Sequence, residues 1–330
     1  MKNRLRAWRS RGELWLAVWL RRYFAWRPRR LEDQGAAPFA VHAFGAASSN
    51  PRRIPSIIWG YWSGSAVPLV VQRCFDNWRA LNPGFSVRIL DAASVRAYIP
   101  SIPSALDGVS EAKRADWVRL ELLRRHGGIW LDASTILTAP LDWVLARQAE
   151  AQCDFVGYYL ERYTSDAAYP VVENWFMAAP PESPFIADLQ REFSTQVVAR
   201  GNEGYIAHLQ ALGVYAQVRQ RIDIPHYLSM HLALQFVLRA GSGCRLCLGK
   251  AEDGPYYYHA LGNWNRAALK IRLLFSRAAD APPPVVKLRK PDRRRLDDYI
   301  ERGLYLPGSL VGQYLLSNPR SRDATPQDSV

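Results

Sequence analysis

Hydrophobic residues along the middle of this chain recur at two spacings, one typical of β-strands and one typical of α-helices. Short apolar runs predict buried strands at residues 54–60, 85–90, 129–131, 155–159 and 172–179. Apolar positions three or four residues apart predict helices at residues 68–81, 93–98, 111–126, 184–200 and 225–240. Strands that alternate with helices favour an α/β fold, whose ligands bind at the carboxyl ends of the strands.

Both ends of the chain depart from this alternation. Residues 31–51 are rich in alanine, glycine and serine without a clear period, so we interpret them as a linker. A Pro-rich and basic C-terminal segment occupies residues 281–330. The globular domain is therefore expected to span residues 52–280.

Residues 1–30 predict a basic amphipathic helix with a stripe of tryptophans. At about 100° per residue, Trp8, Trp15, Trp19 and Trp26 fall within about 40° of one another on a helical projection. The longest apolar run there has seven residues, whereas a helix needs roughly 20 to span a bilayer. Tryptophan prefers the lipid interface and arginine attracts anionic headgroups, so the pattern favours a helix that lies on a membrane surface. The alternative is that these aromatic side chains pack against the folded domain.

The charge of the chain supports the membrane interpretation. The sequence has 43 lysines and arginines against 30 acidic residues, a net charge of +13. Residues 1–30 contain ten basic residues and one acidic residue, so this segment carries nine of the thirteen net charges. A nucleic-acid-binding protein is therefore disfavoured, because the excess charge lies outside the predicted domain.

Four cysteines in 330 residues are too few for a secreted disulfide scaffold. Cys244 and Cys247 have the spacing of half a zinc site, but no second cysteine or histidine pair at ligand spacing accompanies them. We interpret their spacing as incidental and expect reduced thiols.

The strongest candidate chemistry lies where the predicted helix at 111–126 passes into the strand that ends at Asp132. Asp116 and Arg119 are three residues apart and therefore project from the same side of that helix. A pair of glycines then brings the chain back to the sheet. Two carboxylates and a guanidinium are expected to meet at one strand edge, where a ribose or a metal ion can be held. Such ion pairs are also common on solvated helix faces, which is the alternative interpretation.

Three ordered motifs resemble those of the capsular polysaccharide synthesis proteins. They are IPSIIWGYW at 54–62, ADWVRLELL at 115–123 and GGIWLDAS at 127–134. That family is grouped with the DXD-containing sugar transferases, which include yeast α-mannosyltransferases and the glucosylating clostridial toxins. The resemblance is strong over residues 52–180. It implies a GT-A fold with a Rossmann-like nucleotide-binding half, and a retaining glycosyltransferase that uses a nucleotide-sugar donor.

The resemblance implies donor-binding roles for residues in the first half of the domain. Trp59 and Trp62 match the region that meets the nucleotide base. Asp116 and Arg119 match the pair that holds hydroxyls of the donor sugar. Asn174 matches an asparagine presented toward the sugar, and its alternative role is to cap a bulge in a strand of core residues.

Asp132 matches the first carboxylate of the DXD motif, and Trp130 matches the aromatic residue two positions before it. The second carboxylate, usually a direct ligand of Mn²⁺ or Mg²⁺, is replaced here by Ser134. A serine hydroxyl is a poorer ligand for a hard dication than a carboxylate. A divalent cation at Asp132 and Ser134 therefore needs further ligands from the donor diphosphate and a downstream residue. Cationic side chains that replace the metal are the alternative.

Two late segments offer such help. The run YHALGNW resembles the family's His…Ser-Trp close, in which His259 and Asn263 are expected to approach the diphosphate beside Trp264. Lys287 follows a predicted strand and is expected to neutralise charge on the leaving group. The alternative for Lys287 is a solvated position in a basic tail.

The sequence therefore predicts transfer of a hexose from a nucleotide diphosphate sugar to a glycan or lipid-linked saccharide, in the synthesis of a capsular or other surface polysaccharide. The expected partners are the sugar donor, the saccharide acceptor and an anionic membrane surface, with no nucleic acid. The expected location is cytoplasmic, at the inner face of the cell membrane. The alternative is a membrane-associated, non-catalytic scaffold on a degenerate glycosyltransferase fold, for which Ser134 is the main support.

Overall fold

The computed structural model describes residues 2–35, 37–45, 52–241 and 243–317, with side chains described from residue 12 onwards. Strands are β1 (Phe39–Phe44), β2 (Ile57–Tyr61), β3 (Ser86–Leu90), β4 (Gly128–Leu131), β5 (Thr135–Leu137), β6 (Phe155–Leu160), β7 (Val171–Ala179), β8 (Cys244–Lys250) and β9 (Val285–Lys287). Helices are α1 (Lys2–Trp26), α2 (Leu69–Leu81), α3 (Glu111–His126), α4 (Asp142–Ala151), α5 (Pro184–Glu192), α6 (Ala199–Ala211), α7 (Tyr215–Arg219), α8 (Ser229–Ala240), α9 (Tyr257–Ala260), α10 (Arg266–Phe275) and α11 (Leu296–Glu301).

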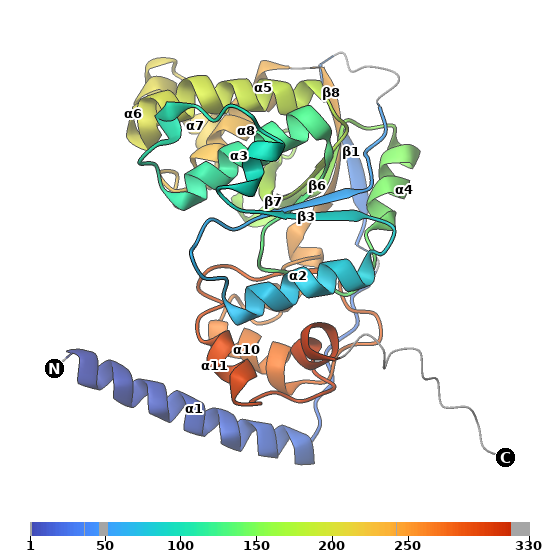
Figure 1. The fold of residues 1–330 in the computed structure, drawn as a ribbon. Helices are drawn as coiled ribbons and strands as arrows, with labels where there is room; N and C mark the ends of the chain where they lie inside the picture. Colours follow the sequence, from blue (N-terminus) through green and yellow to red (C-terminus); the bar gives the residue numbers. More distant parts are fainter. Residues whose placement is uncertain (1, 36, 46–51, 242, 318–330) are drawn as a thin grey trace.

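The main sheet is mixed and has the strand order β1-β8-β6-β7-β4-β2-β3. β2 runs parallel to β3 and β4, whereas β7 runs antiparallel to β4 and β6. α3, α5 and α8 cover one face of the sheet, and α2 with the C-terminal helices covers the other (Figure 1). The parallel β3-β2-β4 edge, with α2 and α3, forms a Rossmann-like half. The expected α/β class with a mixed sheet is confirmed.

The inner strands divide their side chains between two cores, one on each face of the sheet. In β2, Ile58 enters the core beside α2, and Trp59 enters the core beside α3. In β4, Ile129 and Trp130 divide in the same way. These strands are apolar without alternation because successive side chains point to opposite faces and both faces are covered.

Local sequence signals determine both ends of α3. The hydroxyl of Ser110 caps the first turn by accepting from the Lys113 N–H. The helix ends at Gly127, whose φ of 63° favours glycine, and a Cβ there would lie 2.5 Å from the nitrogen of Pro181. The helix predicted at 111–126 is therefore confirmed to the residue.

Residues 31–51, expected to be a linker, contribute an edge strand. β1 pairs antiparallel with β8 along its whole length. Leu31 is buried, and its N–H donates to the carbonyl of Arg277. The interpretation as a plain linker was wrong for residues 39–44. This strand is half exposed and pairs with a strand far along the chain, so its own residues show no clear apolar pattern.

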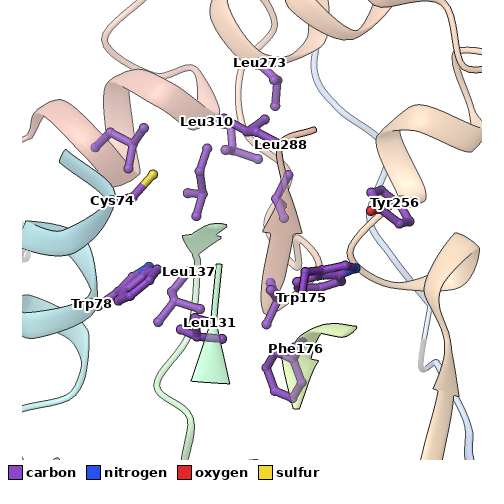
Figure 2. Close-up of a cluster of buried hydrophobic side chains, with 14 of the residues drawn as sticks. Cys74, Trp78, Leu131, Leu137, Trp175, Phe176, Tyr256, Leu273, Leu288 and Leu310 are labelled. Carbon is purple, nitrogen blue, oxygen red and sulfur yellow. The ribbon is translucent and has the colours of Figure 1, made fainter. Parts of the chain in front are cut away.

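The domain also continues past residue 280, which corrects the expected boundary. β9 pairs with β5, and the segment that follows supplies Leu288 and Leu310 to a buried apolar cluster. Figure 2 shows both leucines in the same buried cluster as Trp78, Leu131 and Trp175. The segment was placed outside the domain because it is rich in proline and arginine, but it also contains apolar residues that complete the core.

Other differences are smaller. The helix predicted at 184–200 is α5 followed by a π-helical turn at Phe193–Val198 and then α6. The helix predicted at 225–240 begins at Ser229, and residues 94–97 form a 3₁₀ turn. Cys244 and Cys247 are buried as free thiols in β8, and their side chains enter different cores on opposite faces of the sheet.

α1 confirms the predicted N-terminal helix and packs along one side against the C-terminal helices (Figure 1). Glu13 forms ion pairs with Lys270 of α10 and with Arg295, both at 2.8 Å. Ala17, one turn further along, is buried. None of the described helices is long and apolar enough to cross a membrane.

The other side of α1 carries exposed aromatic side chains. Trp15 and Trp26 are 72% and 73% exposed, and Trp19 is also largely exposed. The ring of Trp19 stacks on Tyr23 with centroids 5.4 Å apart. The alternative in which the tryptophans pack on the domain is therefore wrong for these three, whereas the side chain of Trp8 lies outside the described residues.

Candidate active site

Two carboxylates and one guanidinium meet where α3 faces the end of β4. Arg119 Nη1 donates to Asp116 Oδ1, and Arg119 Nη2 donates to Asp132 Oδ1, each at 2.8 Å. The side chain of Arg119 is only 4% exposed, whereas those of Asp116 and Asp132 are 18% and 32% exposed. The sequence predicted that these three groups meet at one strand edge, and in the structure a buried cation holds two partly exposed carboxylates there.

Trp130 supports this group from the core. Its ring lies 4.9 Å from the guanidinium carbon of Arg119, and its Nε1 donates to Asp132 Oδ1 at 3.2 Å. Trp130 is almost fully buried and has no open face for a ligand, so direct contact with a substrate is excluded. Its role is to position the charged residues.

Asn174 joins the same group from β7. Its Nδ2 donates to Asp116 Oδ1 at 3.2 Å and lies 3.3 Å from the sulfur of Met230. The strand is held to the end of β4 because the N–H of Asp132 donates to the carbonyl of Trp175. The structure therefore brings Asn174 together with the predicted Asp116, Arg119 and Asp132.

Lys287 reaches Asp132 from the opposite side. Its Nζ donates to Asp132 Oδ2 at 2.9 Å and lies 3.5 Å from the hydroxyl of Ser134. The antiparallel pairing of β5 and β9 places Thr135 directly opposite Lys287 and so determines this position. Lys287 is buried, which contradicts the alternative of a solvated cation in a basic tail.

The environment moves the pKa values of the two carboxyl groups in opposite directions. Burial and the negative charge of Asp132 raise the pKa of Asp116 above its usual value, although Arg119 opposes them. Burial also acts to raise the pKa of Asp132, but the charges of Lys287 and Arg119 outweigh it, and the pKa of Asp132 falls below its usual value. Asp132 is therefore the more firmly ionised carboxylate of the two.

Trp59 and Trp62 differ from the expected pair of base-binding residues. Trp59 is buried, and its Nε1 donates to the carbonyl of Gly127 at 2.7 Å. Its expected contact with a base was wrong, because the strand directs this ring into the core. Trp62 is partly exposed, its Nε1 donates to the carbonyl of Ala66, and Arg293 lies 5.6 Å from its ring centroid.

The late segment also divides into a buried part and an exposed part. His259 is buried, and its Nε2 lies 2.9 Å from Asp292 Oδ2, which also accepts from Arg289. The expected contact of His259 with a diphosphate was therefore wrong, since its role is to hold Asp292. Trp264 is partly exposed, and its ring centroid lies 5.1 Å from the guanidinium carbon of Arg289. Asn263, just before it, is exposed and has a left-handed backbone conformation.

Sequence patterns missed contributions from the start of α8. The sulfur of Met230 lies 3.5 Å from Arg119 Nη1, and the hydroxyl of Ser229 accepts from Lys113 Nζ at 3.1 Å. Tyr227, just before them, is exposed, and partial burial together with the charges of Asp116 and Asp132 raises the pKa of its phenol. In the sequence, this region was marked only by Pro225 and by the apolar spacing that predicted a helix at residues 225–240.

The residues around Asp132 and Ser134 do not fit a divalent-ion site. Mn²⁺ and Mg²⁺ bind several oxygen ligands, but both oxygens of Asp132 already accept from cationic side chains. The hydroxyl of Ser134 is buried and donates to the carbonyl of Leu288 at 2.8 Å. Within the described ranges, no group of three or more histidine, cysteine, aspartate or glutamate residues is arranged to hold a metal ion.

Comparison with known proteins gives a family model and two relatives. The model, described as capsular polysaccharide synthesis protein, matches residues 40–238. The chain is 31% identical over 148 residues to the O-glycosyltransferase braB of Annulohypoxylon truncatum, covering 39% of this chain and 34% of that protein. It is 31% identical over 101 residues to the putative glycosyltransferase HOC1 of Saccharomyces cerevisiae, covering 28% of this chain and 26% of that protein. The aligned part thus spans about a third or less of these relatives.

Two solved structures show weak overall similarity. The PaToxG glycosyltransferase superposes with a TM-score of 0.30 and 12% identity, covering 58% of this chain and 88% of that chain. The ligand-free glycosyltransferase domain of the YGT toxin superposes with a TM-score of 0.35 and 10% identity, covering 76% of this chain and 90% of that chain.

Proposed function

Because this chain belongs to the capsular polysaccharide synthesis protein family, we propose that it is a nucleotide-sugar-dependent glycosyltransferase. The observation that carries the proposal is the arrangement of Asp116 and Asp132 on the buried guanidinium of Arg119. Buried charges are costly unless they are paired, so two partly open carboxylates on one buried cation are typical of a functional site. The similarity to two proteins named as glycosyltransferases supports the same reaction class.

The proposed donor is a hexose linked to a nucleoside diphosphate. Asp116 accepts hydrogen bonds from sugar hydroxyls, and Arg119 and Asn174 hold its carboxylate in position. Trp62, Asn263 and Trp264 are the partly or fully exposed members of the predicted set, and we assign them to the rim of the donor site.

The proposed reaction breaks the bond between the anomeric carbon and the diphosphate oxygen, and the electron pair leaves with the nucleoside diphosphate. A hydroxyl oxygen of a glycan or lipid-linked saccharide forms the new bond to that carbon. Its proton passes to the leaving phosphate or to solvent. We propose retention of configuration on the basis of the family resemblance alone. Catalysis then depends mainly on positioning the donor and on stabilising the departing charge.

We assign α1 to the surface of an anionic membrane, with the enzyme at the inner face of the cell membrane. Trp15, Trp19 and Trp26 project from the side of α1 that faces away from the domain. Glu13 fixes the opposite side of the helix through Lys270 and Arg295. Interfacial tryptophans and basic side chains together support binding to anionic lipid, where lipid-linked acceptors are found.

A thermal-shift screen with UDP-, GDP- and CMP-linked sugars tests donor binding. A ligand that binds only the native state stabilises it by mass action, so the true donor is expected to raise the melting temperature of the wild-type protein. Asp116→Asn is expected to lose most of that shift, because a neutral amide has one acceptor oxygen in place of two charged ones and cannot serve both Arg119 and the sugar hydroxyls. No shift with any nucleotide sugar would contradict the proposal.

A non-catalytic scaffold is the second candidate, and Ser134 favours it because the second DXD carboxylate is missing. The two candidates differ in turnover. Under the scaffold hypothesis, a sugar donor that stabilises the protein remains intact during long incubation with acceptor, whereas the transferase releases nucleoside diphosphate.

A further inference from the structure

A cationic side chain occupies the position beside Asp132 where the DXD motif calls for a metal ion. Lys287 Nζ donates to Asp132 Oδ2 at 2.9 Å and lies 3.5 Å from Ser134 Oγ. These are the two residues that the motif comparison assigned to the metal. The ammonium group therefore takes the place between them that a dication would need.

The position of Lys287 is built into the fold. The β5–β9 pairing sets Thr135 opposite Lys287, and the N–H of Leu288 donates to the carbonyl of Ser134. The N–H of Lys287 itself donates to the carbonyl of Pro255, and its Nζ lies 5.5 Å from the ring centroid of Trp175. A lysine held at backbone and side chain in this way is a pre-organised charge rather than a mobile surface cation.

Ser134 fits this arrangement better than a carboxylate does. Its hydroxyl is buried and donates to the carbonyl of Leu288 at 2.8 Å. An aspartate at this position has no proton to give to that carbonyl, and it would add a second negative charge beside Lys287. Ser134 thus takes the place of the second DXD carboxylate, and the buried Lys287 takes the place of the metal ion.

A second cation lies close by with an unused donor. Arg293 stands against the ring of Trp62, and its Nε is buried without a hydrogen-bond partner among the described residues. The Lys287 ammonium has three N–H donors. Asp132 Oδ2 accepts one of them and Ser134 Oγ accepts a second, longer bond, so one donor remains for a ligand. The two positive charges of Arg119 and Lys287 balance the two negative charges of Asp116 and Asp132. Arg293 therefore gives the site a net positive charge.

We propose that this is a metal-independent donor site, in which Lys287 and Arg293 bind the diphosphate of the nucleotide sugar and stabilise the nucleoside diphosphate as it leaves. This inference rests on the proposed transferase function. The ligand class is a nucleoside diphosphate, whose negative oxygens accept from an ammonium and a guanidinium without a bridging dication.

The test measures binding of UDP and GDP to the purified full-length protein by calorimetry, once with EDTA and once with Mn²⁺. The nucleotide that binds is expected to do so with the same affinity under both conditions. Lys287→Met is expected to weaken binding roughly 10- to 100-fold, because a charge-assisted bond to phosphate is lost. The matched control is Lys290→Met, an exposed lysine on the same segment, which is expected to bind as the wild type does.

Two further measurements test the proposal even if Lys287→Met does not fold. Arg293→Gln removes a charge without emptying the core, and it is also expected to weaken nucleotide binding. The electron paramagnetic resonance signal of free Mn²⁺ is expected to stay unchanged when wild-type protein is added. Binding of nucleotide only with Mn²⁺, or full affinity in both Lys287→Met and Arg293→Gln, would overturn the inference and leave the transferase function standing. No nucleotide binding by the wild type under either condition would overturn both.

Discussion

Arg119 Nη2 donates to Asp132 Oδ1 at 2.8 Å, which joins the middle of α3 to the end of β4. The same guanidinium holds Asp116 at 2.8 Å. Both carboxylates therefore depend on one buried side chain for their position and for the balance of their charge.

Arg119→Lys is expected to lower kcat/KM for transfer by about 100-fold, which corresponds to about 2.7 kcal/mol of transition-state stabilisation. A lysine is a single point charge that does not reproduce two parallel N–H bonds to separate carboxylates. Steady-state kinetics and thermal unfolding check this. Arg124→Lys is the matched control and is expected to retain activity, because the side chain of Arg124, which pairs with Glu121, is 37% exposed. Equal kinetics for the two variants would contradict the role of Arg119.

Trp59→Phe is expected to lower the free energy of unfolding by roughly 1–3 kcal/mol, because a buried hydrogen bond to Gly127 and part of the core packing are lost. Nucleotide affinity is expected to stay at the wild-type level, since this ring is buried. Urea unfolding and nucleotide titration together measure the two effects. A variant of normal stability that no longer binds nucleotide would restore Trp59 to the base-binding site.

The acidic limb of the pH profile is expected to report Asp116. Its pKa is raised, so it takes up a proton at a higher pH than the usual aspartate value of about 3.9. The pKa of Asp132 is lowered, so Asp132 stays ionised while Asp116 is protonated. Donor binding and kcat/KM should therefore fall as the pH drops through the raised pKa of Asp116. The residual activity of Asp116→Asn should lack this limb, and an unchanged limb in that variant would assign it to another group.

Binding to vesicles that contain phosphatidylglycerol is expected to weaken roughly 10- to 100-fold in Trp15→Ala, because one large aromatic side chain no longer enters the lipid interface. Trp26→Ala should behave alike, and both variants should bind soluble donor normally. Leu212→Ala, which removes an exposed apolar side chain away from α1, is the control. Co-sedimentation measures the effect. Equal binding by the tryptophan variants and the control would remove α1 from the membrane interface.

The sequence predicted the part of the site that is continuous along the chain. Asp116, Arg119 and Asp132 lie on one helix–strand unit, whose cap at Ser110 and turn at Gly127 are local signals. Their meeting at one edge follows from helix periodicity and from a short connection.

Contacts between distant segments could not be placed in the same way. Lys287 and Asp132 are 155 residues apart and meet through the β5–β9 register, which no local pattern encodes. The β1–β8 pairing escaped prediction for the same reason. The family resemblance placed Trp59 in the base-binding region, and the residues of a strand that is covered on both faces do not reveal which face meets a ligand.

Release of nucleoside diphosphate from a nucleotide sugar, measured with purified protein and a saccharide acceptor, tests the central claim most directly. The wild type is expected to turn over at least one donor. Asp116→Asn and Asp132→Asn are expected to do so about 100-fold more slowly while keeping a native fold by circular dichroism. Turnover that is absent in the wild type, or equal in all three proteins, would contradict the assignment of this carboxylate–arginine cluster as a glycosyltransferase active site.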